Sequence, residues 1–449
     1  MSRAFLHDLL TSIGQKSREL VHGGPAVHTD GAEIAELAET ILSQRGEASG
    51  IALAEIILER FRSMDPAQKL EFFKLLTERF GPEQSRLAAA ARDYLAAPSD
   101  RSAIVLHDAA EPRRQELIRR LNRPDGGTTA LVAMRSDLLD LLPDHPELAA
   151  VDHDFDHLLS SWFNRGFLVL KRIDWDTPAS VLEKVIEYEA VHAIRSWDDL
   201  RRRIEPSDRR CYAFFHPALR DEPLIFVEVA LEREIPGAIA PLLSDDRLPT
   251  QFDHITTAVF YSISNCQHGL RSVSFGNFLI KQVVQELARD LPQLKNFVTL
   301  SPVPGFMRWV KQLKGDGPLQ NDERYQLTST LLEQTDWYRD ESTAATLQEM
   351  LLPMAAAYFL HAKRDDGMPV DAVARFHLGN GARLERINWL GDVSDTGLKQ
   401  AGGLMVNYLY KLRDIEKNHE AFVNNRRIAV TNEIRKMAKK WQQEFSLDK

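Results

Sequence analysis

The chain is poor in cysteine and has no long hydrophobic segment. Cys211 and Cys266 are its two cysteines, too few for the disulfide framework of a small secreted protein. No stretch approaches the roughly 20 apolar residues that a membrane-spanning helix needs. The first residues, MSRAFLHDLLTSIGQKSREL, carry acidic side chains in a helical pattern and lack the apolar core of a signal peptide. These absences predict a soluble, cytoplasmic protein with no membrane association.

The chain also lacks an excess of positive charge. Its 56 Lys and Arg residues against 65 Asp and Glu residues give a formal net charge of −9. A nucleic-acid-binding protein needs a net basic face to replace counterions, so this composition argues against a nucleic-acid partner. A length of 449 residues, 44% of them hydrophobic and 27% charged, is typical of a globular protein with two or three domains.

Helical patterns fill the first third of the chain, and strand patterns begin after it. The segment GAEIAELAETILSQRG places its isoleucines and leucines on one face, and Asp65-Pro66 begins a further helix that ends at Gly81. The breaks are short, which predicts a helical bundle. Later segments such as EPLIFVEVAL alternate in the manner of strands. The sequence therefore predicts an α+β protein, with an all-α domain in residues 1–162 and a mixed α/β domain in residues 163–449.

Two further helical regions are expected inside the second domain. One is a helical insertion between about residues 308 and 363, and the other is a single charged helix from about Asn418 to Phe445.

The segment from 256 to 301 contains a glycine-bearing loop between a strand and a helix. TTAVFYSIS predicts a strand, NFLIKQVVQELARD a helix and LKNFVTLS a second strand, which together form a parallel βαβ unit. The loop, with Gly269 and Gly276, matches neither G-x-x-x-x-G-K-[ST] nor G-x-G-x-x-G. Backbone N–H groups that open a helix suit phosphate oxygens. The alternative is that the glycines only punctuate a turn.

A serine and a histidine are the best-placed candidates for chemistry. Ser301 ends the second strand, at the sheet edge where ligands of open α/β sheets bind, and no G-x-S-x-G elbow surrounds it. VARFHL and ARLERINWL predict a β-hairpin that turns at Gly379–Gly381 and places His377 on its first strand. A histidine near its reference pKa can deliver a proton at neutral pH. Each residue also has an ordinary structural interpretation, as a turn serine or a strand histidine.

Metal binding is not expected. His153 and His157 stand four residues apart in HDFDH, but no third ligand follows at a usable spacing, and the pattern is typical of a solvated helix face. Cys266 has no C-x-x-C partner that would indicate a reactive thiol.

Several longer motifs occur in one order between about residues 155 and 412. They are EAVHAI (from Glu189), RRCYAFF (from Arg209), FYSIS followed by QHGL, LSPVPGF (from Leu300), FHLGNGARLERINW with DVS, and GGLMVNYLY (from Gly402). In these motifs the chain resembles the malonyl-CoA decarboxylase family. The resemblance implies a helical oligomerisation domain followed by a catalytic domain of acetyltransferase-like (GNAT) fold. It also implies a homo-oligomer, dimeric or tetrameric, assembled through the helical domain.

The resemblance assigns residues to the site. The Gln/Arg-x-x-Gly-x-Gly/Ala loop that holds coenzyme A in acetyltransferases falls on Arg271–Gly276, with Ser274 in place of the first glycine. The implied coenzyme A-binding residues are Gly269, Arg271, Ser272, Val273, Ser274, Phe275, Gly276 and Asn277. The catalytic serine and histidine of the family fall on Ser301 and His377. Asn388, Ser394 and Tyr410 lie in matched motifs without an assigned role.

The implied reaction converts malonyl-CoA to acetyl-CoA and CO2. The thioester is itself the electron sink, so no metal or organic cofactor is expected. Ser301 is expected to hold the malonyl carboxylate or the thioester oxygen, and His377 to stabilise charge and donate the proton. Three alternatives share the fold: an acyl-CoA-dependent acetyltransferase, a non-enzymatic acyl-CoA sensor, and a decarboxylase that also accepts methylmalonyl-CoA.

Overall fold

The computed structural model describes residues 30–43, 46–273, 279–314 and 322–445. The chain forms two compact units. The helical unit comprises Met1–Leu168 and two short later segments, His216–Arg220 and Gln267–Phe275. The sheet unit comprises Val169–Phe215, Asp221–Cys266 and Gly276–Lys449. The helical unit thus includes part of the loop that follows the strand FYSIS.

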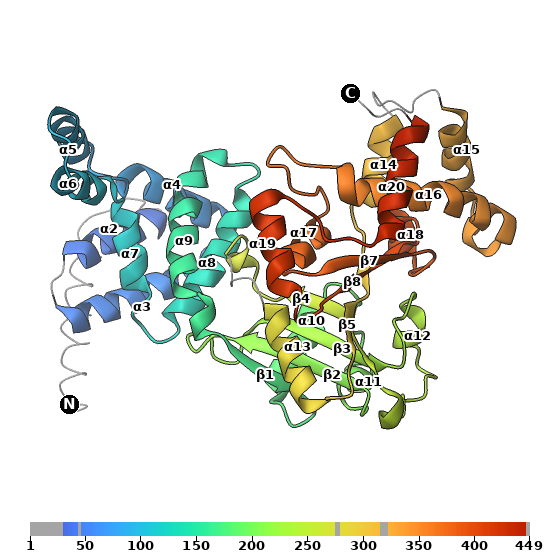
Figure 1. Ribbon diagram of the computed structural model, residues 1–449. Coiled ribbons are helices and arrows are strands. Elements are labelled where there is room, and N and C mark those ends of the chain that lie inside the picture. The colour runs from blue at the N-terminus through green and yellow to red at the C-terminus, as the bar shows by residue number, and fades with distance from the viewer. Residues whose placement is uncertain (1–29, 44–45, 274–278, 315–321, 446–449) are drawn as a thin grey trace. The chain divides into compact units, whose positions relative to one another are not determined.

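The helical unit contains short helices, which are blue to green in Figure 1 except for η4, which comes later in the chain and is yellow. Their bounds are α2 (Asp30–Ser43), α3 (Glu47–Ser63), α4 (Pro66–Arg79), α5 (Gln84–Ala96), α6 (Asp100–Ala110), α7 (Arg113–Leu121), α8 (Gly127–Leu141), α9 (Ala149–Trp162), η1 (Pro146–Leu148), η2 (Arg165–Phe167) and η4 (His268–Leu270). As predicted, α4 begins after Asp65, whose side chain accepts the backbone N–H of Gln68 in a capping box. Its buried Phe72 and Phe73 meet Phe61 of α3 in edge-to-face contacts at 5.3 and 5.6 Å between ring centroids.

The sheet unit is built on one eight-stranded sheet in the order β1-β2-β3-β4-β5-β8-β6, with β7 also paired to β8. The strands are β1 (Val169–Ile173), β2 (Arg209–Phe215), β3 (Pro223–Glu232), β4 (Thr257–Asn265), β5 (Asn296–Thr299), β6 (Ser301–Pro302), β7 (Arg383–Asn388) and β8 (Met405–Leu409). β4 and β5 are parallel and are joined by helix α13 (Leu279–Asp290), which confirms the predicted βαβ unit. The predicted α+β class, a helical region followed by a mixed sheet, is confirmed.

Helices cover both faces of the sheet. On one face, α10 (Ala179–Tyr188) and α11 (Trp197–Ile204) bury Val185 and Leu200 against residues of β2 and β3 that include Ala213. On the other face, α13 lies across the strands in Figure 1, and its Asp290 acts electrostatically on Tyr212, the neighbour of Ala213 in β2. Because successive strand residues point to opposite faces, this arrangement buries both sides of the strands.

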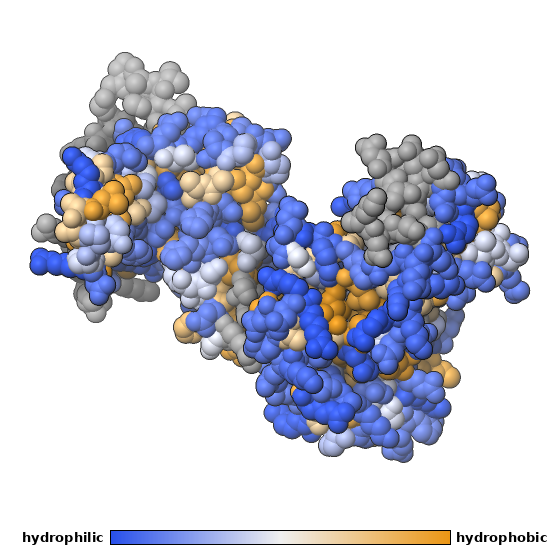
Figure 2. Space-filling view, turned by 45° about the horizontal axis from the view of Figure 1, so that its top comes forward, coloured by the Kyte–Doolittle hydropathy of each residue, from blue (hydrophilic) through white to orange (hydrophobic). Residues whose placement is uncertain are grey.

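The C-terminal half of the sheet unit adds further helices. They are α12 (Ala240–Leu243), η3 (Phe252–His254), α14 (Phe306–Lys314), α15 (Glu323–Leu332), η5 (Trp337–Arg339), α16 (Glu341–His361), α17 (Ala372–Gly379), α18 (Asp395–Ala401), α19 (Ile415–Asn425) and α20 (Asn432–Phe445). The described parts of the predicted insertion, residues 308–314 and 322–363, are mainly helical. In Figure 2 the surface of this unit is mainly hydrophilic, with hydrophobic residues gathered in a recess.

Two local predictions are wrong. The single helix expected from Asn418 to Phe445 is two helices, because Arg426 adopts a left-handed φ of 55° and ends α19. The expected β-hairpin is a helix followed by a strand, so His377 lies on α17. Asp371 caps this helix by accepting the N–H of Ala374 at 2.7 Å, and Gly381 follows it with a φ of 82°.

Candidate active site

His377 lies in the last turn of α17 and is 3% exposed. Its ring stacks on Tyr408 of β8, with 4.6 Å between the ring centroids. Nε2 is 3.1 Å from Oγ of Ser301, and Nδ1 is 2.8 Å from the hydroxyl oxygen of Tyr410. The structure thus brings together the two residues that the sequence singled out, and it adds a tyrosine at the second ring nitrogen.

Ser301 is held by contacts with β5 and β8 of the sheet. It forms β6, pairs with Val406 of β8, and donates its hydroxyl proton to Oγ1 of Thr299 at 2.9 Å. Thr299 is itself held by β8, because Tyr408 N–H donates to its Oγ1 at 3.1 Å and Asn407 Nδ2 donates to its carbonyl at 2.8 Å. These bonds fix the position of the serine oxygen, which lies 3.1 Å from Nε2 of His377.

The four side chains form one continuous chain of hydrogen bonds, Tyr410–His377–Ser301–Thr299. Burial lowers the pKa of His377 to about 3, so the imidazole is neutral at neutral pH. Because Ser301 donates to Thr299, its oxygen accepts the proton on Nε2 of His377. Nδ1 of the neutral ring is then the acceptor for the Tyr410 hydroxyl. A tyrosine hydroxyl can also accept, so Tyr410 can accommodate a ring that gains a second proton.

A cavity of about 240 Å³ opens onto this chain of hydrogen bonds. Ser301 and His377 line it together with the apolar side chains Val191, Phe260, Ile263, Pro302, Ala372, Val373 and Phe376, the ring of Tyr261, and Asn265 at the end of β4. A carboxylate in such a cavity is poorly solvated unless these few polar groups hydrogen-bond it. The site therefore suits a small acyl group that loses its charge during the reaction.

The segment that supplies Val191 to the cavity is held by a buried glutamate. The Glu189 carboxylate accepts the backbone N–H groups of Val191 and His192 at 2.8 and 2.7 Å, and the Ser262 hydroxyl at 2.7 and 2.8 Å. Burial lowers the pKa of His192 to about 4, against a smaller opposing effect of Asp392. Glu189, Val191 and His192 lie in the EAVHAI motif, to which the sequence assigned no structural role. In the structure, Glu189 anchors this loop to β4 through Ser262.

The candidate coenzyme A loop is described in part. Gly269, Arg271, Ser272 and Val273 lie in the helical unit, whereas Ser274, Phe275, Gly276 and Asn277 lie outside the described residues. Gly269 sits so close to α8 that a Cβ would lie 1.9 Å from the carbonyl oxygen of Val132. Arg271 and Ser272 are exposed, and Ser272 has a φ of 71°.

Other sequence candidates have structural roles. Ser394 caps α18 by accepting the N–H of Gly397, and Asn388 donates to Asn407 at 2.9 Å. Cys211 and Cys266 are free and buried, and burial raises the pKa of both thiols, which makes them poor nucleophiles.

The described ranges contain no group of three or more His, Cys, Asp and Glu residues placed to hold a metal ion. Across the same residues, no helix has the length and apolar character to cross a membrane.

Comparison with known proteins assigns most of the chain to one family. Residues 80–163 match the malonyl-CoA decarboxylase N-terminal domain, and residues 166–447 match the C-terminal domain. Malonyl-CoA decarboxylase, mitochondrial, of the goose Anser anser anser is 36% identical over 85% of this chain and 82% of its own.

Crystal structures of malonyl-CoA decarboxylases are also similar to this chain. The Rhodopseudomonas palustris protein has a TM-score of 0.87 at 55% identity, covering 90% of this chain and 99% of its own. The Agrobacterium vitis protein has a TM-score of 0.86 at 54% identity with the same coverage. The chain therefore belongs to the malonyl-CoA decarboxylase family.

Proposed function

We propose that this chain decarboxylates malonyl-CoA to acetyl-CoA and CO2, with Ser301 and His377 as its catalytic residues. The observation that carries the proposal is the hydrogen-bonded Ser301–His377 pair at the wall of a small, mostly apolar cavity. Membership of the family over most of the chain supports the same reaction.

The reaction consumes one proton. The bond between the α-carbon and the carboxylate breaks, CO2 leaves, and the electron pair moves into the thioester to form an enolate. The α-carbon then takes a proton. A neutral imidazole cannot supply it without becoming an anion, so the donor is the imidazolium form of His377. The malonyl carboxylate supplies the opposite charge that raises the pKa of His377 in the complex, so the proton enters with the substrate.

Each polar group then has one task. The Ser301 hydroxyl and the Asn265 amide donate to the malonyl carboxylate or to the thioester oxygen, where charge develops. The His377 imidazolium donates Nε2–H to the α-carbon, while Nδ1–H donates to the Tyr410 hydroxyl, 2.8 Å away. The imidazole is left neutral when acetyl-CoA leaves, and it takes up its next proton from solvent when malonyl-CoA binds. The loop from Gly269 onward, with the side chain of Arg271, holds the pyrophosphate of coenzyme A.

The test is to incubate the purified protein with malonyl-CoA, without added metal or acyl acceptor, and to follow acetyl-CoA. His377→Ala should lower kcat roughly 10²–10⁴-fold, as expected for loss of a positioned acid, and change KM far less. Equal kcat in the variant and the wild type would remove His377 from the mechanism.

The product separates the alternatives. Acyl transfer only after addition of an amine would indicate an acetyltransferase, and tight binding without turnover would indicate a sensor. Methylmalonyl-CoA adds one methyl group, which a pocket discriminates by only about 1–3 kcal/mol, so it should be the slower substrate rather than an inert one.

We also propose a homo-oligomer, dimeric or tetrameric, formed through the helical unit. The α5–α6 hairpin supports this, because Leu95, Ile104 and Val105 are 78%, 61% and 48% exposed on its surface. Helices of 13 and 11 residues gain little stability alone and need an apolar partner surface. Sedimentation should show an oligomer, and Leu95→Ser with Ile104→Ser should shift it toward monomer. Unchanged sedimentation would exclude this hairpin from the interface.

For the location we propose the cytoplasm, where a reducing environment matches two free, buried thiols. Cell fractionation with an antibody to the chain tests this, and recovery with membranes or an exported fraction would contradict it.

A further inference from the structure

Arg135 of α8 is a fully buried arginine whose side chain is 0% exposed. A guanidinium carries five N–H donors in one plane, and its burial is unfavourable unless they are paired. All five are paired here. The acceptors are Asp152 (2.8 Å from Nε), the carbonyl oxygens of Gly269 and Arg271 (3.1 and 2.9 Å from Nη1), and Asp156 and Ser272 Oγ (both 3.1 Å from Nη2).

Three of these acceptors belong to the candidate coenzyme A loop, and two of them are backbone carbonyls. The described peptides are all trans, so the carbonyl of one residue and the N–H of the next point in opposite directions. The Arg271 carbonyl faces Arg135, and the N–H of Ser272 therefore faces away from it. A backbone N–H presented in this way is the kind of donor that phosphate oxygens accept.

The same contacts hold Ser272 in an unfavourable conformation. Its φ of 71° is left-handed, which residues with a Cβ adopt only when their surroundings impose it. Its hydroxyl accepts from Arg135 and donates to Asp156 of α9 at 2.6 Å. Gly269, at the other end of this segment, lies directly against the backbone of α8. Helices α8 and α9 thus impose the shape of residues 269–273.

We propose that Arg135 is a positioning residue for coenzyme A: it aligns the loop so that its N–H groups can bind the pyrophosphate. This rests on the proposed function, because it takes residues 269–273 as part of the coenzyme A site. Helices α8 and α9 then control substrate affinity, whereas the α5–α6 hairpin serves assembly. Loss of the arginine would also leave Asp152 and Asp156 unneutralised beside a loop that must receive an anion.

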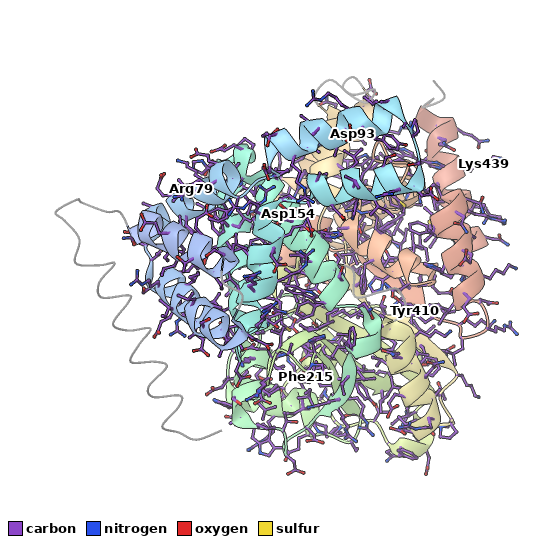
Figure 3. All side chains as sticks on the ribbon, turned by 90° about the vertical axis from the view of Figure 1, so that its left-hand side faces the viewer. Arg79, Asp93, Asp154, Phe215, Tyr410 and Lys439 are labelled. Atoms are coloured by element: carbon purple, nitrogen blue, oxygen red, sulfur yellow. The ribbon has the colours of Figure 1, made fainter. Side chains whose placement is uncertain are left out.

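A purely structural ion pair is the competing explanation, and the chain offers a matched control. Arg114 of α7 is also buried in the helical unit, at 5% exposure. It pairs with Asp154 of α9, the residue labelled in Figure 3, and donates to the carbonyl of Ala150 at 3.3 Å. None of these partners belongs to the loop.

The experiment compares malonyl-CoA with malonyl-N-acetylcysteamine, which keeps the thioester but lacks the nucleotide and pyrophosphate. The quantity measured is the ratio of kcat/KM for the two substrates. A lysine at this position keeps the positive charge but cannot donate hydrogen bonds to all five acceptors. Arg135→Lys should therefore lower the ratio roughly 10-fold or more, because KM for malonyl-CoA rises. Arg271→Ala should also lower it. Arg114→Lys should leave it unchanged even where it lowers the melting temperature.

A normal ratio in Arg135→Lys together with a lowered ratio in Arg271→Ala would overturn the inference and leave the proposed function intact. If the wild type decarboxylates neither malonyl-CoA nor malonyl-N-acetylcysteamine, both the inference and the proposed function are overturned. If Arg135→Lys does not fold, as judged by circular dichroism, Asp156→Asn carries the test, because it removes an acceptor shared by Arg135 and Ser272. An unchanged ratio in Asp156→Asn would likewise overturn the inference.

Discussion

Tyr410→Phe removes one oxygen atom from the chain of hydrogen bonds that supports His377. The hydroxyl is buried and lies 2.8 Å from Nδ1 of His377. In the free protein its loss leaves a buried acceptor unpaired. In the reacting complex it leaves Nδ1–H of the imidazolium without an acceptor, and hydrogen bonds to charged groups contribute more than neutral ones, about 1.5–3 kcal/mol.

Loss of the Tyr410 hydroxyl therefore costs free energy mainly in the complex in which His377 is an imidazolium. Taking about 1.4 kcal/mol per tenfold change in rate, kcat should fall roughly 10–100-fold. KM for malonyl-CoA should change far less, because Tyr410 does not line the cavity. The assay is initial-rate formation of acetyl-CoA over a range of malonyl-CoA concentrations, with thermal unfolding of the same samples.

Tyr325→Phe is the matched control. Tyr325 is another buried tyrosine of the sheet unit, and its hydroxyl donates to the carbonyl of Val310 at 2.6 Å. The Tyr325→Phe variant should lose about as much stability as Tyr410→Phe, but its kcat should equal that of the wild type. If Tyr410→Phe keeps kcat within about twofold of wild type while both variants lose similar stability, the hydroxyl has only a structural role, and the argument about the imidazolium is wrong.

Three further predictions follow from the same site. Binding of a malonyl-CoA analogue that cannot lose CO2 should take up close to one proton, seen by titration calorimetry in buffers of different ionisation enthalpy, and His377→Asn should abolish the uptake. Burial lowers the pKa values of His377 and His192 from 6.5 to about 3 and 4, so both lower stability as pH falls below 6.5. At pH 5.5 each histidine should lower the free energy of unfolding in urea by roughly 1.4 kcal/mol relative to its value at neutral pH. The His192→Asn variant should lose the part of this pH dependence that His192 causes. Asp371→Ala, which uncaps α17, should cost about 1–2 kcal/mol and lower kcat, whereas Asp65→Ala on α4 should cost about 1 kcal/mol with kcat unchanged.

The sequence was informative where a local pattern determines the structure. The βαβ unit follows from two apolar strands and an amphipathic helix at a spacing that allows one common solution, and β4 and β5 are indeed parallel. The α4 helix begins at its predicted cap for the same reason. The position of Ser301 after β5 follows directly from that unit.

His377 shows where local pattern is insufficient. Asn380-Gly381 is a frequent turn signal, but the same pair can follow the end of a helix, and here Gly381 does so with a φ of 82°. Asp371 before the segment, with Ala374 and Leu378 four residues apart, was the signal for a helix. Tyr410 lay in a matched motif but could be given no role from the sequence, because its role depends on β8 lying beside β6 and bringing it to a ring 33 residues earlier.

Burial of the Ser301–His377 pair explains why the site carries no permanent charge. An imidazolium kept permanently in an apolar cavity would need a permanent carboxylate partner, and such a partner would repel the malonyl carboxylate. Burial instead keeps His377 neutral in the free protein, and the substrate brings the charge that makes protonation favourable. Loss of CO2 moves that negative charge onto the enolate, and transfer of the proton from the imidazolium to the α-carbon neutralises the enolate and the ring together. After this step neither the negative charge nor the positive charge remains in the cavity, so no ion pair holds acetyl-CoA there.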